Sequence, residues 1–246
     1  MHGLARRKLV NIGLLALALS VSALFTSLGM WQLDRAEQKH DALVEFESRG
    51  LATQVNLNQS IVGDSSALEG YRATATGHYI SANILLDNQL HQGRAGYLVY
   101  SVFELDGRSR SILINHGWIP ARADRQPAHE FKTAIGNMRL EGRLSKPPAM
   151  GLRLTGSDLI ERLADNSWRV QAIDFTELSN SLGEDLLFVT LQLEDAVPAG
   201  FVRTWTSPAS DEARHWGYAF QWFAMAVAVM VIAAIIMLRS GRTRIS

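Results

Sequence analysis

The 246-residue sequence contains no cysteine. That absence excludes disulfides, thiolate metal sites, iron–sulfur clusters, covalent c-type haem attachment and cysteine nucleophiles. Common catalytic signatures are missing as well, since there is no GxSxG, no HExxH and no phosphate-binding loop. We therefore expect a protein that is not an enzyme. A hydrolase site would require residues that only folding brings together.

Charge is absent from two long stretches, Leu9–Trp31 and Trp216–Leu238. At about 1.5 Å per residue, each helix would reach about 34 Å, enough to cross a hydrocarbon core of about 30 Å. All 24 acidic residues lie between Asp34 and Glu212, whereas basic residues flank both stretches at the chain ends. The positive-inside rule then predicts that both termini are cytoplasmic and the middle lies outside.

This pattern predicts five regions along the chain. They are a cytoplasmic N-terminus (1–8), a transmembrane helix (9–31), a periplasmic domain (32–214), a second transmembrane helix (215–238) and a cytoplasmic C-terminus (239–246). The first residues do not resemble a transit peptide, which favours a bacterial cell inner membrane. A cleaved signal peptide is the alternative for the first span, but the apolar run exceeds a usual signal core of about 7–15 residues. The basic residues form no patch of the kind that binds nucleic acid.

Short runs rich in β-branched and aromatic residues fill the middle region. We predict strands at Tyr71–Tyr79, Ile84–Asn88, Tyr97–Leu105, Ser109–Asn115, Met138–Leu144, Trp168–Gln171 and Leu187–Leu193. Asp106-Gly107 predicts a hairpin turn, Asp34 to Gly50 a helix, and Asp174–Glu177 a capping box that opens a second helix. The predicted fold is two terminal transmembrane helices flanking an α+β, mainly antiparallel-β, barrel-like extracytoplasmic domain.

One helix face stands out at the outer entrance of the second span. It presents His215, Tyr218, Ala219, Trp222 and Ala226. The small residues would let a flat partner or another helix approach closely. The imidazole of His215 could ligate a haem iron, with Tyr218 and Trp222 beside the macrocycle and Arg214 near its propionates. Alternatively, His215 is an interfacial anchor that bonds the preceding loop.

Two further places are candidate contacts with partners. Trp31 is expected to anchor at the membrane interface, and Gln32 to bond across to the second span. Arg35 and Lys39 share a helix face that could meet lipid phosphates or partner carboxylates, the alternative being a solvated face. Gly117 predicts a close backbone approach beside Trp118, which is either a core residue or a partner contact.

Four segments resemble the Surfeit locus protein 1 family, and the resemblance spans nearly the whole chain. They are GMWQLDRAEQK (29–39), ILLDNQLHQGRAGYLVYSVF (84–103), LINHGWIP (113–120) and HWGYAFQWFAMA (215–226). The last two are the most specific. Two departures are His116 and Gln89, where the family commonly has Arg, so any role of those cations is in doubt here.

The resemblance implies a non-enzymatic assembly factor for cytochrome c oxidase that assists delivery of haem a to subunit I, or its stabilisation there. Oxidase subunit I is the implied partner, with a haem a synthesis enzyme as a further one, and His215 matches the family's candidate haem ligand by position. Two other functions stay open. One is a purely structural membrane chaperone for an oxidase subunit, and the other is an extracytoplasmic binding or sensor domain.

Overall fold

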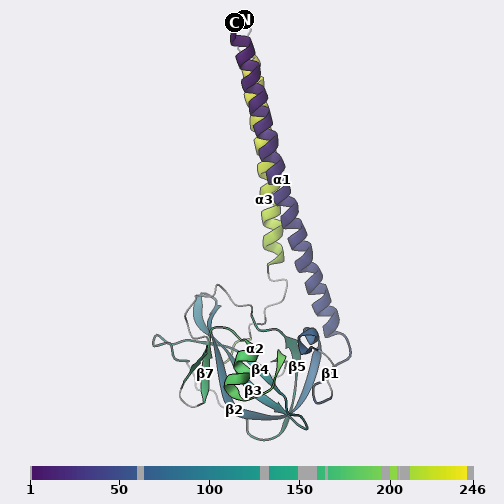
Figure 1. Cartoon of the computed structure of the whole chain (residues 1–246), viewed down its shortest axis with the longest axis vertical. Helices are drawn as coiled ribbons and strands as arrows, with labels where there is room; N and C mark the ends of the chain where they lie inside the picture. Colours follow the sequence, from purple (N-terminus) through teal and green to yellow (C-terminus); the bar gives the residue numbers. More distant parts are fainter. Residues whose placement is uncertain are drawn as a thin grey trace. The chain divides into compact units, whose positions relative to one another are not determined.

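The computed structural model describes residues 2–59, 64–127, 133–148, 160–163, 166–194, 200–203, 205 and 211–242. For residues 2–8 and 240–242 it describes the backbone alone. The chain divides into two compact units, one formed by Met1–Val44 with Ser207–Ser246 and the other by Glu45–Thr206. The first unit is a pair of helices and the second is rich in strands (Figure 1).

The first helix is longer than predicted, because α1 runs without interruption from His2 to Gly50. The sequence predicted a span ending at residue 31 and a separate helix from Asp34. No proline occurs before Pro120, and charged helix-forming residues follow the apolar stretch directly, so nothing in the sequence breaks the helix between them. The second long helix, α3, covers Glu212–Arg242 and contains the expected second span.

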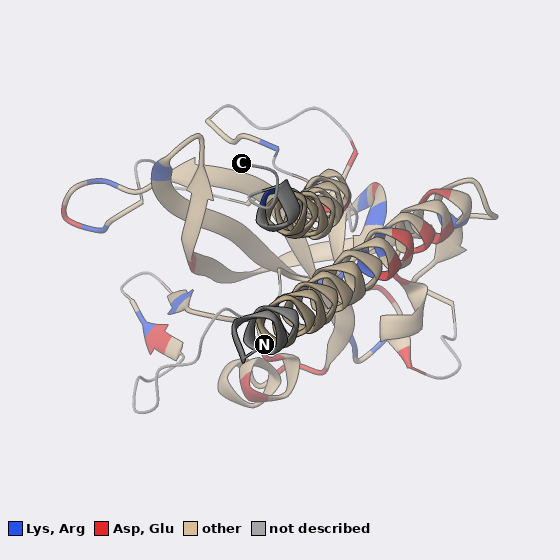
Figure 2. Ribbon diagram, turned by 90° about the horizontal axis from the view of Figure 1, so that it is seen from above, with Lys and Arg blue, Asp and Glu red and all other residues tan. Residues whose placement is uncertain are grey.

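Both helices are long and apolar enough to cross a membrane by length and composition. Figure 2 draws the turns of α1 that follow the grey ones in tan, and the blue and red residues of this helix lie further along, beyond Trp31. Leu17, Leu24, Val231 and Ile232 are among the many large apolar side chains that the helix pair exposes. An exposed apolar surface of this extent is typical of helices that contact lipid.

The second unit is built on an eight-stranded sheet with the order β3-β4-β8-β5-β2-β7-β6, in which β1 also pairs with β2, and β3 with β2. The strands are β1 (Val55–Asn56), β2 (Arg72–His91), β3 (Arg94–Leu105), β4 (Ser111–Pro120), β5 (Met138–Ser145), β6 (Ile160–Arg162), β7 (Ser167–Val170) and β8 (Leu186–Leu193). A 3-10 helix, η1 (Ser65–Leu68), and a short helix, α2 (Phe175–Leu182), complete it.

The sheet is mixed rather than purely antiparallel. Among the pairings that the described residues make, those of β1 with β2, β2 with β7 and β4 with β8 are parallel. The five others are antiparallel. The pairings β2–β3, β3–β4, β4–β8, β8–β5 and β5–β2 link one another in succession, so β2 has neighbours on both edges.

Strand β2 joins two predicted strands into one of 20 residues. Its register against β3 shifts between Tyr79 and Asn83 and again between Leu86 and Gln89. Such shifts are bulges, which bend a strand and keep it paired where polar residues suggest a break. The Asn83 side chain accepts a hydrogen bond from the Ser101 hydroxyl at 2.8 Å, which satisfies one polar group at the first bulge.

Local signals in the sequence agree with the structure at two positions. Gly107, with φ of 72°, lies in the predicted turn between β3 and β4. Asp174 caps α2 by accepting from the backbone amides of Thr176 and Glu177 at 3.0 and 3.1 Å, and Gly183 ends the helix in the left-handed conformation.

The core lies on both sides of β4, which is buried over nearly its whole length. One cluster includes Phe103, Ile112 and Ile114, and a second includes Tyr100, Leu113 and Trp118. A third, smaller cluster includes Tyr97, Val99 and Ile119. Successive strand residues point to opposite faces, so a strand buried on both faces has apolar residues at consecutive positions.

The last turns of α1 belong to this second unit rather than to the helix pair. The Arg143 side chain donates to the Phe46 carbonyl at 2.5 Å and lies 3.7 Å from the Phe46 ring centroid. Arg49 donates to the Glu69 carbonyl at 2.9 Å. The Arg143 contact satisfies a carbonyl group near the helix C-terminus, and both contacts fix the end of α1 within the second unit, which begins at Glu45.

Candidate functional site

The two long helices pack closely within the first unit. A Cβ atom added at Gly29 would lie 2.7 Å from the Phe223 ring, which is too close for any side chain without a shift. The Ser22 hydroxyl donates to the Ala226 carbonyl at 3.0 Å, and the Phe25 and Trp222 rings lie 5.5 Å apart. Small residues and interhelical hydrogen bonds of this kind are how helices associate in lipid.

A polar contact joins the helices at the predicted site. The Nδ1 atom of His215 lies 2.7 Å from Oε1 of Gln32, whose side chain is buried. The expected bond from Gln32 to the second span is therefore present. An amide oxygen only accepts hydrogen bonds, so Nδ1 carries the hydrogen in a neutral imidazole and Nε2 keeps its lone pair.

The remaining residues of the predicted face divide between the interior and the outside of the helix pair. Ala219 and Ala226 are buried at 1% and 7% exposure, so α1 fills the space beside them. The sequence left a flat partner and a helix as alternatives here, and the partner that the structure shows is the helix. Trp222 is half-buried against Phe25, while Tyr218 is exposed.

Arg214 lies at the start of α3 and pairs with Asp211, with 3.1 Å between Nη1 and Oδ1. Both side chains are largely exposed, so the contact contributes little stability and leaves the guanidinium at the surface. A haem near His215 fits this donor set in one respect, since Nε2 is the ring nitrogen that keeps a lone pair. It does not fit a slot between the helices at Ala219 and Ala226, because that space is occupied.

The predicted contact residues of α1 lie mostly at its surface. Trp31 is 57% exposed, and Arg35 donates to the Gln38 side chain at 2.9 Å. Lys39 is half-buried. One neighbouring contact was not anticipated: Nδ1 of His40 lies 3.4 Å from Oε1 of Glu212 at the start of α3. Only folding reveals it, because neither residue belongs to a recognisable motif.

Trp118 is a core residue with 4% exposure. Its indole Nε1 donates to the Gln89 carbonyl at 2.9 Å, and its backbone exchanges hydrogen bonds of 2.7 and 2.8 Å with Val202. Gly117 has φ of 118°, and a Cβ atom there would lie 2.7 Å from the Val202 carbonyl oxygen. The close backbone approach predicted for this motif is thus present, and it serves to dock the 200–203 segment.

His116 lies in the same motif and is buried, with its ring 5.7 Å from Tyr79 and 6.0 Å from Phe201. Burial lowers the pKa of the His116 imidazole to about 3, so the side chain is neutral at physiological pH. His116 therefore cannot supply the positive charge that an arginine would have at this position. Instead, its neutral ring packs between the rings of Tyr79 and Phe201.

The Asp-Asn-Gln segment, residues 87–89, lies within β2 at the second shift of its register against β3. Asp87 accepts from the Asn88 backbone at 2.7 Å and from the Arg125 guanidinium at 2.5 Å. Gln89 donates its side-chain amide to the Asp87 carbonyl at 3.0 Å. Asn88 has a positive φ of 59°, which Asn adopts more readily than most residues. The segment therefore organises the hairpin, and the cation that pairs with Asp87 comes from elsewhere in the chain.

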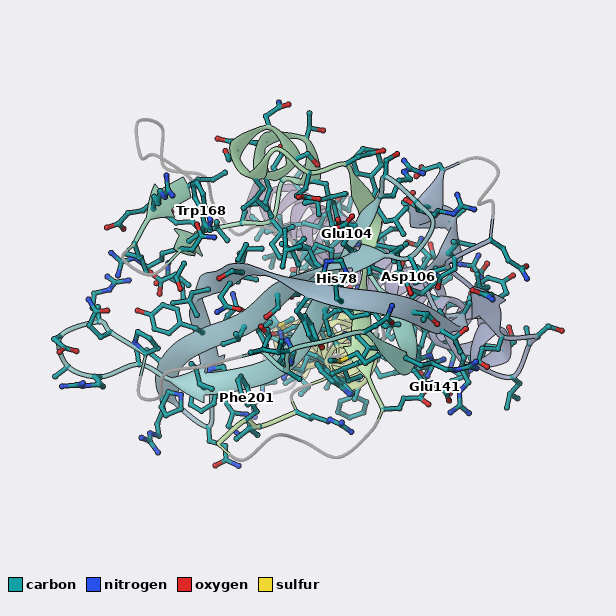
Figure 3. All side chains as sticks on the ribbon, turned by 90° about the horizontal axis from the view of Figure 1, so that it is seen from below. His78, Glu104, Asp106, Glu141, Trp168 and Phe201 are labelled. Atoms are coloured by element: carbon teal, nitrogen blue, oxygen red, sulfur yellow. The ribbon has the colours of Figure 1, made fainter. Side chains whose placement is uncertain are left out.

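His78 on β2 and Glu104 on β3 form a histidine–carboxylate pair on the strand surface. They lie next to each other on neighbouring strands, with 3.4 Å between Nε2 and Oε2 (Figure 3). Both side chains are nearly half exposed, at 48% and 43%. No group of three or more His, Cys, Asp or Glu residues that could hold a metal ion is found within the described ranges. We assign no ligand to this pair.

Comparison with known proteins agrees with the sequence motifs. A model of the SURF1 family matches residues 19–227. The chain is 21% identical to a SURF1-like protein of Caenorhabditis elegans, in an alignment that covers 88% of this chain and 71% of the worm protein. A SURF1-like protein of Caenorhabditis briggsae is 22% identical, with 88% and 73% coverage. The family match includes most of α1 and the first half of α3, and therefore both Gln32 and His215.

Proposed function

This chain belongs to the SURF1 family, and we propose that it acts as an assembly factor for cytochrome c oxidase, receiving or stabilising haem a and presenting it to subunit I. The family match supports the link to oxidase assembly. The haem part of the proposal rests on a single observation, the 2.7 Å contact that leaves Nε2 of His215 as a lone-pair donor. A haem a synthesis enzyme is a further partner that this role would need.

In this proposal the protein is anchored in the cell inner membrane by α1 and α3. Both helices are apolar over a length that crosses a bilayer, and their outer apolar side chains are exposed. The three basic residues near each end of the chain favour cytoplasmic termini, and with this topology the strand-rich unit would be periplasmic. His215 would then lie near the periplasmic surface of the inner membrane, where a haem could enter from the lipid or from a neighbouring protein.

Haem a is the cargo here, and it supplies the oxidase with an iron centre for electron transfer and oxygen chemistry. His215 would bind the iron through Nε2, and exposed Tyr218 would lie one turn further along the same side of α3. Arg214 remains at the surface, where its guanidinium could exchange Asp211 for a propionate. Nothing in this role requires the protein to catalyse a reaction, and we propose that it is not an enzyme.

A purely structural chaperone is the second candidate, and the helix packing favours it. Gly29 against Phe223 and the buried Ala219 and Ala226 leave α1 and α3 in direct contact along this face. A tightly packed pair of helices with an exposed apolar surface could hold an oxidase subunit without any haem. The two functions differ in whether purified protein carries a chromophore.

The test is an absorption spectrum of the full chain purified from cells that make haem a. We expect a haem a spectrum for the wild type and its loss, at unchanged protein yield, for His215→Ala. The matched control is His40→Ala, because His40 also lies on the helix pair, is exposed and contacts α3. Equal haem content in wild type and His215→Ala would remove His215 as the ligand. A wild type without haem would favour the structural chaperone.

A further inference from the structure

Gln32 is an unusual residue for its position. It is 8% exposed, lies one turn beyond Gly29 and one turn before the fully buried Ala36, and faces α3. Burying a side-chain amide away from water is costly unless its polar atoms are hydrogen-bonded. The contact that satisfies Oε1 is the one with His215 Nδ1 at 2.7 Å. The amide is thus held in a closely packed interface with its oxygen against one particular ring nitrogen.

We infer that Gln32 is a positioning residue that fixes His215 in the Nδ1–H tautomer, so that Nε2 is kept available for a metal centre of the metalloporphyrin class. The two nitrogens lie on different sides of the imidazole ring, and a neutral ring carries its hydrogen on one of them. The nitrogen that donates to an acceptor is the one that keeps the hydrogen, and the other is the ligand. Histidines that bind metals commonly have such a partner for their second nitrogen.

The identity of the metal centre rests on the proposed function, but the tautomer does not. Gln32 could instead serve only to hold the helices together, since interhelical hydrogen bonds also stabilise helix association in lipid. The chain offers a comparison for that role, the His40–Glu212 contact of 3.4 Å, which joins the same two helices. Loss of that contact would remove a link between α1 and α3 without changing the partner of His215.

The first experiment is nitrogen-15 NMR of the full chain in detergent micelles, with histidine rings labelled and the His215 signals identified by their absence in His215→Gln. In the wild type we expect a protonated Nδ1 and an unprotonated Nε2. Gln32→Leu should move the hydrogen toward Nε2, whereas Gln32→Glu should retain the wild-type pattern because a carboxylate oxygen also accepts from Nδ1. Glu212→Gln, the matched control, should leave the pattern unchanged. The wild-type spectrum alone is informative if Gln32→Leu does not fold.

The second readout is titration of the same five proteins, the wild type and the four variants, with ferric haem, followed by absorption. Loss of the partner of a metal-binding histidine commonly lowers affinity 10–100-fold, and we expect a decrease of about that size for Gln32→Leu, with Gln32→Glu and Glu212→Gln close to the wild type. A wild-type His215 protonated on Nε2, or a Gln32→Leu variant with an unchanged tautomer, would overturn the inference. The expected tautomers together with haem binding that is insensitive to His215→Gln would uphold it and refute the proposed haem site instead.

Discussion

At the scale of single residues, the Asn-x-Gly-Trp motif shows how a recognisable sequence pattern can have a mainly structural cause. Trp118 is buried and bonded to Gln89, and Gly117 allows the Val202 backbone to approach. These contacts join β4 to the hairpin of β2 and β3 and to the segment that precedes α3. The motif therefore holds together parts of the chain that are distant in sequence.

Trp118→Ala should lower the free energy of unfolding of the strand-rich unit by about 3–5 kcal/mol, because it removes a large buried ring and leaves a cavity. Chemical denaturation of the purified protein, followed by circular dichroism, measures this change. Trp31→Ala is the control, since Trp31 is 57% exposed and lies on the helix pair. A Trp118→Ala protein of normal stability and abundance that fails to support oxidase activity would favour a partner contact instead.

The buried imidazole of His116 should make stability depend on pH. Its pKa is lowered by burial to about 3 in the folded protein, against an ordinary value of 6.5. Between these values the unfolded chain binds more protons, so the free energy of unfolding falls as pH decreases from about 6.5 toward 3. Above about pH 6.5 His116 is neutral in both the folded and the unfolded chain, and its contribution to the free energy of unfolding is then fully present.

Comparison of wild type and His116→Leu in denaturation curves from pH 7 to pH 4 isolates this effect from that of the carboxylates. We expect the wild type to lose more stability than the variant over this range. His78→Leu serves as a control at a half-exposed position of the same sheet and leaves His116 in place. Identical pH dependence in wild type and His116→Leu would show that His116 is protonated equally in both states.

At the scale of secondary structure, most strands were predictable and the two shortest were not. The strands β3, β4, β5 and β8 have eight or more residues, and α2 has both a cap and a terminating glycine. By contrast, β1 and β6 have two and three residues, too few to form an alternation. Parallel pairing, as between β4 and β8, depends on contacts between distant segments and leaves no local signal.

The candidate site was predictable to a similar degree. The helical period placed His215 and Trp222 on one side of α3, but it could not show that Ala219 would be covered by α1 while Tyr218 stays exposed. A hydrogen bond from Gln32 to the second span was expected. That its partner is Nδ1 of His215 depends on how closely the two helices pack, which the sequence does not give. Packing geometry of that kind depends on the side chains of both elements at once.

Close packing at Gly29 should decide whether α1 and α3 stay together. Gly29→Leu would place a side chain where Phe223 already lies, whereas Gly13→Leu, on the same helix, meets nothing within 4 Å. The chain has no cysteine, so a Ser22→Cys, Ala226→Cys double variant carries the only thiols. We expect a short thiol cross-linker to join them efficiently, with similar efficiency in the Gly13→Leu background and much less in the Gly29→Leu background. Equal cross-linking in all three would contradict the observed packing.

At the scale of the whole molecule, two compact units with different surfaces share one chain. The helix pair exposes large apolar side chains, whereas the strand-rich unit encloses apolar residues in three clusters. The acidic residues all lie between Asp34 and Glu212, outside the apolar stretches. An uneven distribution of this kind suits a protein whose units occupy different solvents, one of lipid and one of water.

The proposed topology predicts where reporter enzymes will be active. Alkaline phosphatase inserted at Gly107, in the exposed turn between β3 and β4, should be active because the strand-rich unit is expected in the periplasm. A fluorescent protein fused to either terminus should fold and fluoresce, as it does in the cytoplasm.

Replacing Arg6, Arg7 and Lys8 by glutamine should lower phosphatase activity, because the positive-inside signal is weakened. An intact mass lacking the first apolar stretch would instead identify it as a cleaved signal peptide and leave α3 as the single span.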